Sequence, residues 1–102
     1  MPELYTCGIW QVAPGSEEDF VSAWRDLAEW TAEHTPGAGA ATLVQDTGQP
    51  NRFVSFGPWE SAEAIDAWRA SSGFQERVGK MQALLEAFEP GTFRRRASVG
   101  IA

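Results

Sequence analysis

A strand that leads directly into a capped helix, over residues 52–71, limits the folds open to this chain more than any other feature. Residues 52–57 are rich in aromatic and β-branched side chains, which predicts a strand, and its tail runs into Gly57-Pro58-Trp59-Glu60-Ser61. Ser61 then stands where a helix N-cap is expected, before a short helix that carries Trp68 on its apolar side. The sequence therefore predicts a compact unit here, made of a strand tail that ends in Trp, a serine cap and a helix.

The rest of the chain also divides into strands and helices. The other predicted strands are residues 4–12, 40–46 and 92–101, and the other predicted helices are 17–34, with Ser16 as its N-cap, and 74–88. The last helix has an apolar stripe at helical spacing, made of Phe74, Val78, Met81, Leu85 and Phe88, and Glu89-Pro90-Gly91 is expected to end it. A short turn separates strands 40–46 and 52–57, which predicts an antiparallel hairpin.

This order predicts an α+β fold of one domain, residues 1–102, with a four-stranded antiparallel sheet and the helices on one face. Apolar residues occur on both sides of several strands, as where Val54 and Phe56 alternate with Phe53. A sheet that is apolar on both faces is best explained by a second copy of the chain on the face without helices. The expected partner is therefore the chain itself, in a homodimer.

Charge and cysteine content exclude several classes of function. A formal net charge of −6 argues against nucleic acid as a partner, because binding phosphate needs a basic surface. Arg94, Arg95 and Arg96 are interpreted either as a solvated strand edge or as partners for an anionic ligand or a second subunit. Cys7 has no partner for an intrachain disulfide, and its neighbours favour a small buried side chain. Neither a signal peptide nor a membrane-spanning run is recognised, so a cytoplasmic protein with no membrane partner is expected.

Three stretches of sequence carry a resemblance to a known family: Phe56-Gly57-Pro58-Trp59-Glu60-Ser61, Ala67-Trp68-Arg69-Ala70-Ser71 and Phe74. Together with the order of the predicted elements, they resemble the antibiotic biosynthesis monooxygenase domain family over residues 5–96. The resemblance implies a ferredoxin-like βαββαβ protomer that pairs with a second copy into a dimeric α/β barrel.

The resemblance implies two kinds of chemistry. Some members of that family oxidise phenolic or quinol-type aromatic molecules with molecular oxygen, and they use no metal or flavin. Others bind and degrade haem, but their iron-ligating histidine corresponds to Val78 here, and an asparagine of their first strand corresponds to Gly8. Haem is therefore the less favoured expectation, and a monooxygenase that needs no cofactor is predicted.

Aromatic and apolar residues near the predicted helices form the candidate substrate site. Trp68 lies on the inward side of its helix, where it is either ordinary core or the wall of a cavity that stacks an aromatic ring. The resemblance favours the second interpretation, because these barrels hold their ligands in that region. The candidate substrate-binding residues are Trp68, Phe74, Phe56, Val78, Met81, Trp10 and Trp59.

Few residues offer acid–base chemistry. His34 is the one side chain whose unperturbed pKa lies near neutrality, and its place at a helix end equally suits a surface cap. Asn51 and Tyr5 are able to contact a substrate oxygen, and they complete the set of candidate catalytic residues. One His and one Cys are too few for a usual metal site, so none is predicted. The alternative function is a non-catalytic, ligand-binding or stress-related dimer of the same fold.

Overall fold

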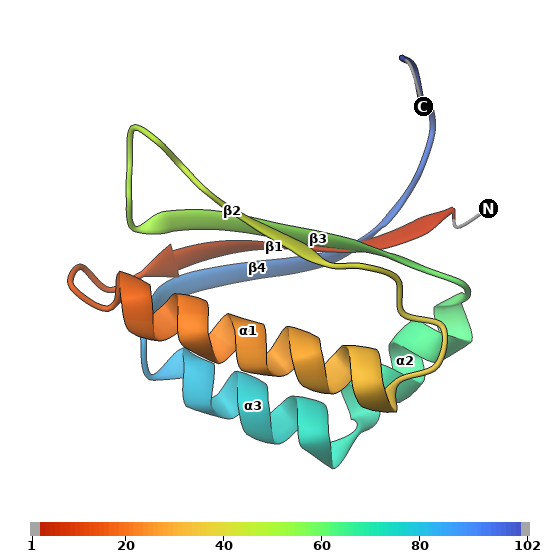
Figure 1. Ribbon diagram of the computed structural model, residues 1–102, viewed down its shortest axis with the longest axis horizontal. Coiled ribbons are helices and arrows are strands. Elements are labelled where there is room, and N and C mark those ends of the chain that lie inside the picture. The colour runs from red at the N-terminus through yellow and green to blue at the C-terminus, as the bar shows by residue number, and fades with distance from the viewer. Residues whose placement is uncertain (1–2, 101–102) are drawn as a thin grey trace.

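The computed structural model describes residues 3–100, in which four strands form one antiparallel sheet. The strand order is β2-β3-β1-β4, and the three helices cover one face of the sheet (Figure 1). The elements are β1 (Leu4–Val12), α1 (Glu17–His34), β2 (Thr42–Gln45), β3 (Arg52–Trp59), α2 (Ala62–Ala70), α3 (Ser72–Gln82) and β4 (Leu85–Arg94). This is the predicted ferredoxin-like βαββαβ arrangement, with the second helical region divided into α2 and α3.

The register of the central strand β1 fixes which side chains face the helices. Trp10 of β1 is opposite Phe53 of β3 and Phe88 of β4. Because side chains alternate along a strand, the buried pair Trp10 and Phe53 faces the helices, whereas the neighbouring pair Ile9 and Val54 faces the other way.

The core lies between the sheet and the helices. The ring of Phe20 from α1 lies between two strand rings, with centroids 5.2 Å from Trp10 and 5.0 Å from Phe53. Trp10 also stacks on Phe88, with a centroid separation of 3.9 Å. Burial of each such ring contributes about 1.5–3 kcal/mol, so this cluster holds the helices against the sheet. The buried cluster consists of Trp10, Val12, Phe20, Leu27, Phe53 and Met81.

Serine side chains cap the start of two helices, at the predicted Ser61 and at Ser71, which the sequence does not predict as a cap. Ser61 Oγ accepts a hydrogen bond from Ala64 N at 3.1 Å, and Ser71 Oγ accepts one from Phe74 N at 3.2 Å. Ser16 stands at the N-cap of α1, but its side chain makes no capping hydrogen bond. Acidic residues in the first turn of α1 complement the helix dipole there instead.

The boundary between the last helix and the last strand differs from the sequence prediction. α3 ends at Gln82 rather than at Phe88, and β4 begins at Leu85 rather than at residue 92. Apolar residues three apart suit a helix, but Leu85 and Phe88 pair with β1 in the sheet instead. Pro90, which is predicted to end a helix, lies inside β4, where proline is tolerated because β4 is an edge strand.

The other differences are smaller. β2 is shorter than predicted, and β3 is longer. In the predicted last strand, residues 92–101, alternation would place Phe93, Ala97, Val99 and Ile101 on one apolar face. Phe93 lies in β4, whereas Ala97 and Val99 follow it outside any strand. Ile101 lies outside the described residues.

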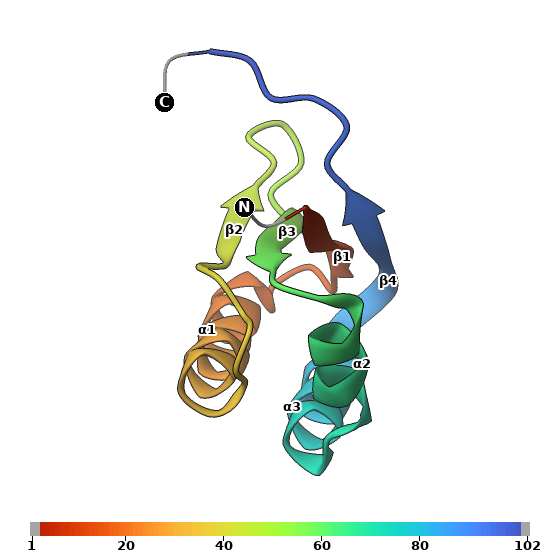
Figure 2. The same cartoon turned by 90° about the vertical axis from the view of Figure 1, so that its right-hand side faces the viewer.

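The sheet face without helices carries exposed apolar side chains, as the alternation of the strands predicts. Ile9 is 37% exposed, Phe56 39%, Val44 46% and Phe93 56%. Strand register places all four on the same face, opposite to the helices (Figure 2). An apolar sheet face of this kind is a typical site of protein–protein contact.

Candidate functional site

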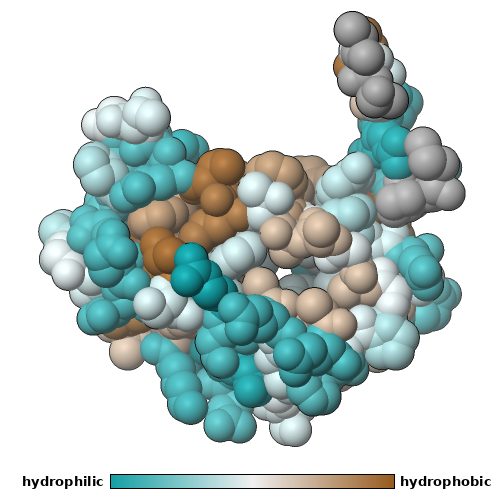
Figure 3. Space-filling model, viewed as in Figure 1, coloured by the Kyte–Doolittle hydropathy of each residue, from teal (hydrophilic) through white to brown (hydrophobic). Residues whose placement is uncertain are grey.

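A cavity of about 500 Å³ lies between the helix-covered face of the sheet, α1 and the α2–α3 pair. Figure 2 shows α1 and the α2–α3 pair beneath the sheet, and Figure 3 shows the surface hollowed between the sheet and α1. Small-molecule sites commonly measure about 300–1,000 Å³ and are mostly apolar, as this one is. The aromatic residues that border it are Trp10, Trp24, Phe56, Trp59, Trp68, Phe74 and Phe88.

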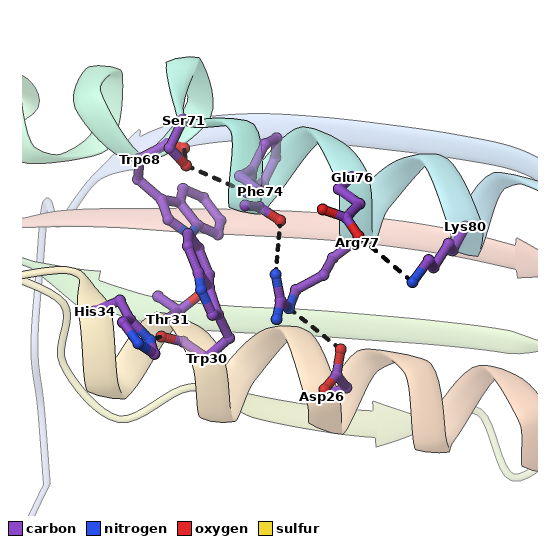
Figure 4. A network of polar contacts seen from close by, with 11 residues as sticks. Asp26, Trp30, Thr31, His34, Trp68, Ser71, Phe74, Glu76, Arg77 and Lys80 are labelled. Atoms are coloured by element: carbon purple, nitrogen blue, oxygen red, sulfur yellow. Dashed lines mark hydrogen bonds and ion pairs between the residues drawn. The ribbon is translucent and has the colours of Figure 1, made fainter.

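Trp68 is the centre of one aromatic wall. Its ring centroid lies 4.4 Å from Phe74, in an edge-to-face arrangement, and 4.9 Å from Trp59. Ser71 joins the end of α2 to the start of α3, because its Oγ donates to Trp68 O at 2.7 Å and accepts from Phe74 N (Figure 4). The short helix junction therefore sets the two rings beside each other.

Three of the tryptophans that border the cavity donate their indole N–H to a hydroxyl of another bordering residue. The pairs are Trp68 Nε1 to Thr31 Oγ1, Trp10 Nε1 to Ser55 Oγ and Trp59 Nε1 to Thr6 Oγ1, each at 2.9 Å. Among residues 3–100, Thr31 and Ser55 are the buried polar side chains, at 8% and 9% exposure. Each hydrogen bond holds both of its side chains in place.

Gly8 provides the space for the pair formed by Trp10 and Ser55. A Cβ at this position would lie 2.9 Å from Trp10 Nε1, 3.0 Å from a ring carbon of Phe88 and 3.1 Å from Ser55 Oγ. Gly8 is directly opposite Ser55 in the sheet. A larger residue would therefore displace the groups that form the floor of the cavity.

Small and charged residues border the cavity near the α1–β2 connection. Residues 38–41 are glycines and alanines, and Gly39 N donates to Pro58 O at 2.8 Å. A Cβ on Gly39 would lie 2.6 Å from Pro58 Cγ, so this close approach requires glycine. Arg25 and Glu29 of α1 are exposed and also border the cavity.

Within the described part of the chain, the titratable residues that border the cavity are Cys7, Arg25, Glu29 and Arg69. Arg69 Nη1 donates to Thr92 Oγ1 at 2.9 Å. Burial raises the pKa of the Cys7 thiol above its usual value, so the thiol is protonated at neutral pH and is a poor nucleophile. The polar groups that the protein buries at the cavity are the hydroxyls and indole N–H groups described above, and these are neutral.

Arg77 joins α3 to α1. Its Nε lies 3.2 Å from Asp26 Oδ2, in an ion pair without hydrogen-bond alignment, and its guanidinium carbon lies 4.8 Å from the ring centroid of Trp30. Arg77 Nη1 also donates to Gly73 O at 3.2 Å (Figure 4). The contacts with Asp26 and Trp30 tie together two helices that border the cavity.

Most of the predicted substrate-binding residues border the cavity: Trp10, Trp59, Trp68, Phe74 and Val78. Met81 is fully buried in the core cluster and does not border it. Phe56 borders the cavity, but strand alternation directs its side chain to the helix-free face. A role in substrate binding stays a prediction for all seven.

The three predicted catalytic residues lie outside the cavity border, and the fold does not bring them together. His34 is exposed at the end of α1, where its Nδ1 lies 3.0 Å from Trp30 O. Asn51 Nδ2 donates to Val12 O at 3.1 Å, which ties the turn before β3 to the end of β1. Tyr5 alternates onto the helix-free face of β1. Their catalytic role stays a prediction.

The sequence prediction missed Trp24 and Phe88, which border the cavity, and it also missed the hydroxyl residues. Thr31 lies on the same helix face as Leu27, and Ser55 lies on the inward side of β3 two residues after Phe53. A hydroxyl residue at an inward position is therefore the sequence signal that points to a polar group inside the cavity. It is a weak signal, because Ser and Thr also occur in cores when they find a hydrogen-bond partner.

The arginine run lies away from the cavity. Arg94 is the last residue of β4, and Arg95 N donates to Glu3 O at 2.7 Å. Arg94, Arg95 and Arg96 do not border the cavity, so a ligand inside it is not their partner. Pairing with a second subunit stays a prediction.

No helix among residues 3–100 is long and apolar enough to cross a membrane. In the same range, no group of three or more His, Cys, Asp or Glu side chains is placed to hold a metal ion.

A sequence model of one protein family, described as antibiotic biosynthesis monooxygenase, matches residues 8–80 of this chain. The matched region runs from β1 to α3 and includes Thr31, Trp68 and Phe74. No curated protein matches the chain.

Several solved structures share the fold. SnoaB, a cofactor-independent oxygenase from Streptomyces nogalater, has a TM-score of 0.88 and 24% identity, over 97% of this chain and 98% of that one. A conserved protein from Methanosarcina mazei has a TM-score of 0.84 and 20% identity, over 94% and 95%. PA3566 from Pseudomonas aeruginosa has a TM-score of 0.78 and 21% identity, over 95% and 97%. At such identities the likeness concerns the fold.

Proposed function

Because this chain belongs to the antibiotic biosynthesis monooxygenase family, we propose that it oxidises a phenolic or quinol-type aromatic molecule with molecular oxygen, without metal or flavin. The observation that carries the proposal is the apolar cavity of about 500 Å³, which is bordered by Trp59, Trp68 and Phe74. Flat aromatic molecules pack well against such rings in offset or edge-to-face geometry.

The proposed reaction makes few demands on the protein. A deprotonated aromatic substrate supplies the electrons that reduce oxygen. With anthrone, the ring methylene loses two hydrogens and gains one oxygen atom from O₂, which gives anthraquinone, and the other oxygen atom leaves as water. The protein has to bind the ring, exclude water and stabilise the negative substrate oxygen. The apolar lining and the buried hydroxyls suit these needs.

Anthrone turnover tests the proposal directly. The purified protein, treated with a chelator and free of flavin, is mixed with anthrone in oxygenated buffer. We expect anthraquinone to form faster than in buffer alone, with one O₂ consumed for each anthrone. The absence of any rate above background, with anthrone and with a set of dihydroquinones, would contradict the proposal.

Two alanine substitutions locate the reaction within the molecule. Ala28 of α1 borders the cavity, whereas Ala67 of α2 is exposed and does not. Ala28→Phe adds a ring that fills part of the cavity, so we expect it to remove most of the turnover. Ala67→Phe adds the same bulk elsewhere and is expected to leave the rate unchanged. Circular dichroism of both variants controls for loss of the fold.

One observation favours a second candidate, a ligand-binding protein without catalysis: His34, Asn51 and Tyr5 all lie outside the cavity border. On this alternative, anthrone or anthraquinone quenches tryptophan fluorescence but no oxygen is consumed. Haem stays the least favoured ligand, because Val78 borders the cavity where a haem-degrading relative would carry its iron ligand. Titration with haemin is therefore expected to give no shift of the Soret band.

The proposal includes a homodimer. The helix-free face presents Ile9, Val44, Phe56 and Phe93, each more than a third exposed. Covering this face with a second copy would remove these side chains from water, which is favourable at about 25 cal/mol per Å² of apolar surface.

A further inference from the structure

The hydrogen bond between Trp68 and Thr31 leaves one proton of the pair without a protein partner. An indole nitrogen is a donor only, so Thr31 Oγ1 is the acceptor of this bond, at 2.9 Å, and its own proton remains to be donated. A threonine within a helix often donates to the carbonyl four residues earlier, which here belongs to Leu27. Among residues 3–100, Thr31 makes no side-chain hydrogen bond besides the one with Trp68.

Thr31 is placed where a ligand ring would meet it. It is 8% exposed and borders the cavity from α1. Its partner Trp68 is half-buried and borders the same cavity from α2 (Figure 4). A flat ligand that packs against the ring of Trp68 therefore brings its rim toward the Thr31 hydroxyl.

The pair formed by Trp10 and Ser55 has the same hydrogen bond in different surroundings. Trp10 is 4% exposed, belongs to the core cluster and stacks on Phe88 at 3.9 Å. The protein itself thus packs around this indole, whereas Trp68 is left more accessible. This difference favours Thr31 over Ser55 as a ligand contact and makes Ser55 a matched comparison.

We propose that Thr31 determines specificity in this cavity by donating a hydrogen bond to a ring-carbonyl or enolate oxygen of the ligand. The cavity then selects fused-ring ketones and their enolates over hydrocarbons of the same shape. This inference rests on the proposed function and deepens it, because it names the residue that recognises the substrate oxygen. A ligand N–H could use the free lone pair of Thr31 Oγ1, but the hydroxyl proton would stay unpaired.

Two ligands that differ by one oxygen test the inference. Fluorenone carries a ring carbonyl, and fluorene has the same three rings without it. Dissociation constants are measured by quenching of tryptophan fluorescence and by calorimetry. We expect fluorenone to bind about tenfold more tightly, because fluorene leaves a buried donor unpaired. Equal affinities would overturn the inference.

Substitutions assign the preference to Thr31. Thr31→Val alone would free the indole N–H of Trp68 to donate in the hydroxyl's place, so the comparison is made in a Trp68→Phe protein. Trp68→Phe is expected to keep the preference. Trp68→Phe with Thr31→Val is expected to lose it, with tighter binding of fluorene, because fluorene then buries no unpaired hydroxyl. Thr31→Ser in the Trp68→Phe protein should retain the preference for fluorenone. Ser55→Ala in the protein with Trp68 intact should also retain it. A preference that survives in the Trp68→Phe, Thr31→Val protein would overturn the assignment.

The unaltered protein gives a second readout that does not depend on how the variants fold. A hydrogen bond to a carbonyl lowers its stretching frequency. We expect the infrared carbonyl band of bound fluorenone to lie below its position in a hydrocarbon solvent. A band at the hydrocarbon position would overturn the inference.

The binding measurements can be separated from the test of turnover. A fluorenone preference that depends on Thr31, without anthrone oxidation, supports the ligand class and contradicts the proposed oxidation. Anthrone oxidation with equal affinity for the two probes leaves the proposed function in place and overturns the role of Thr31.

Discussion

At the scale of single residues, two glycines of α3 have opposite surroundings. A Cβ added to Gly73 would collide with the ring of Trp30, whereas one added to Gly79 would meet no atom within 4 Å. The contact at Gly73 lets the bulky Trp30 side chain pack closely against the start of α3. Close packing therefore requires glycine at position 73 but not at position 79.

We expect the two alanine substitutions at these positions to change stability in opposite directions. Gly73→Ala should lower the free energy of unfolding by about 1–3 kcal/mol, because Trp30 has to move. Gly79→Ala should raise it by about 0.5–1 kcal/mol, because alanine is the better helix former. Urea denaturation of both variants measures the difference. A stabilising Gly73→Ala would contradict the close contact with Trp30.

The pKa of Cys7 sets its reactivity with pH. Burial raises the pKa of this thiol, and the thiolate is the reactive form, so we expect alkylation by iodoacetamide to be slower than for free cysteine near neutral pH. The rate should rise as the pH approaches the raised pKa. Mass spectrometry follows the reaction, with Cys7→Ser as the unreactive control. A rate equal to that of free cysteine would contradict this prediction.

The residues of the candidate site differ in how far the sequence could predict them. Trp68 and Phe74 could be found because large aromatic side chains at inward helix positions border any cavity present there. Thr31 could not, because its importance depends on the indole of a residue 37 positions away along the chain. The spacing of residues along the sequence does not predict which side chains of two separate helices touch.

At the scale of elements, Asp46 organises the turn between β2 and β3. Its Oδ1 accepts from Gly48 N at 2.8 Å and from Gln49 N at 3.1 Å, and its Oδ2 lies 3.4 Å from Arg52 Nη1. The hydrogen bond from Gly48 is the largest cause that lowers the pKa of Asp46 below its usual value. The turn is therefore held best when this carboxylate is ionised.

We expect Asp46→Ala to lower the melting temperature at neutral pH and to matter less in acid. A folded-state pKa below the unfolded value gives stabilisation that is full above the unfolded pKa and is lost as the pH falls through the folded pKa. The difference between the two proteins should therefore shrink as the pH is lowered. Asp66→Ala, at an exposed position on α2, is the control. A difference that does not change with pH would contradict the role of the charge.

The order of the elements could be predicted from the sequence, whereas one boundary could not. Turn residues and alternating apolar side chains mark β1, the hairpin and the start of each helix. Between Gln82 and Leu85 no strong signal separates α3 from β4, and the apolar spacing continues across the junction. Pairing with β1 decides that Leu85 and Phe88 are strand residues, and that pairing depends on tertiary structure.

At the scale of the whole molecule, both faces of the sheet are apolar, but the helices cover just one. The cavity depends on how α1 and the α2–α3 pair pack together beneath the sheet (Figure 2). No local pattern encodes that packing. The existence of an apolar second face, in contrast, follows from alternation within single strands and could be predicted.

We expect the protein to sediment as a dimer at micromolar concentration and Phe56→Lys to shift it toward the monomer. Phe56 is 39% exposed on the helix-free face, and a buried, unpaired ammonium there would oppose association. Ala67→Lys adds the same charge on exposed α2 and should stay dimeric. A stable monomer of the unaltered protein would contradict the proposed dimer.

Both edges of the sheet are poor templates for an additional strand. β2 is four residues long, and β4 contains Pro90, which has no backbone N–H to offer. Lateral growth into open-ended filaments is therefore discouraged on either side. If copies associate, they do so back to back through the exposed face, and since each molecule has one such face, assembly terminates at two.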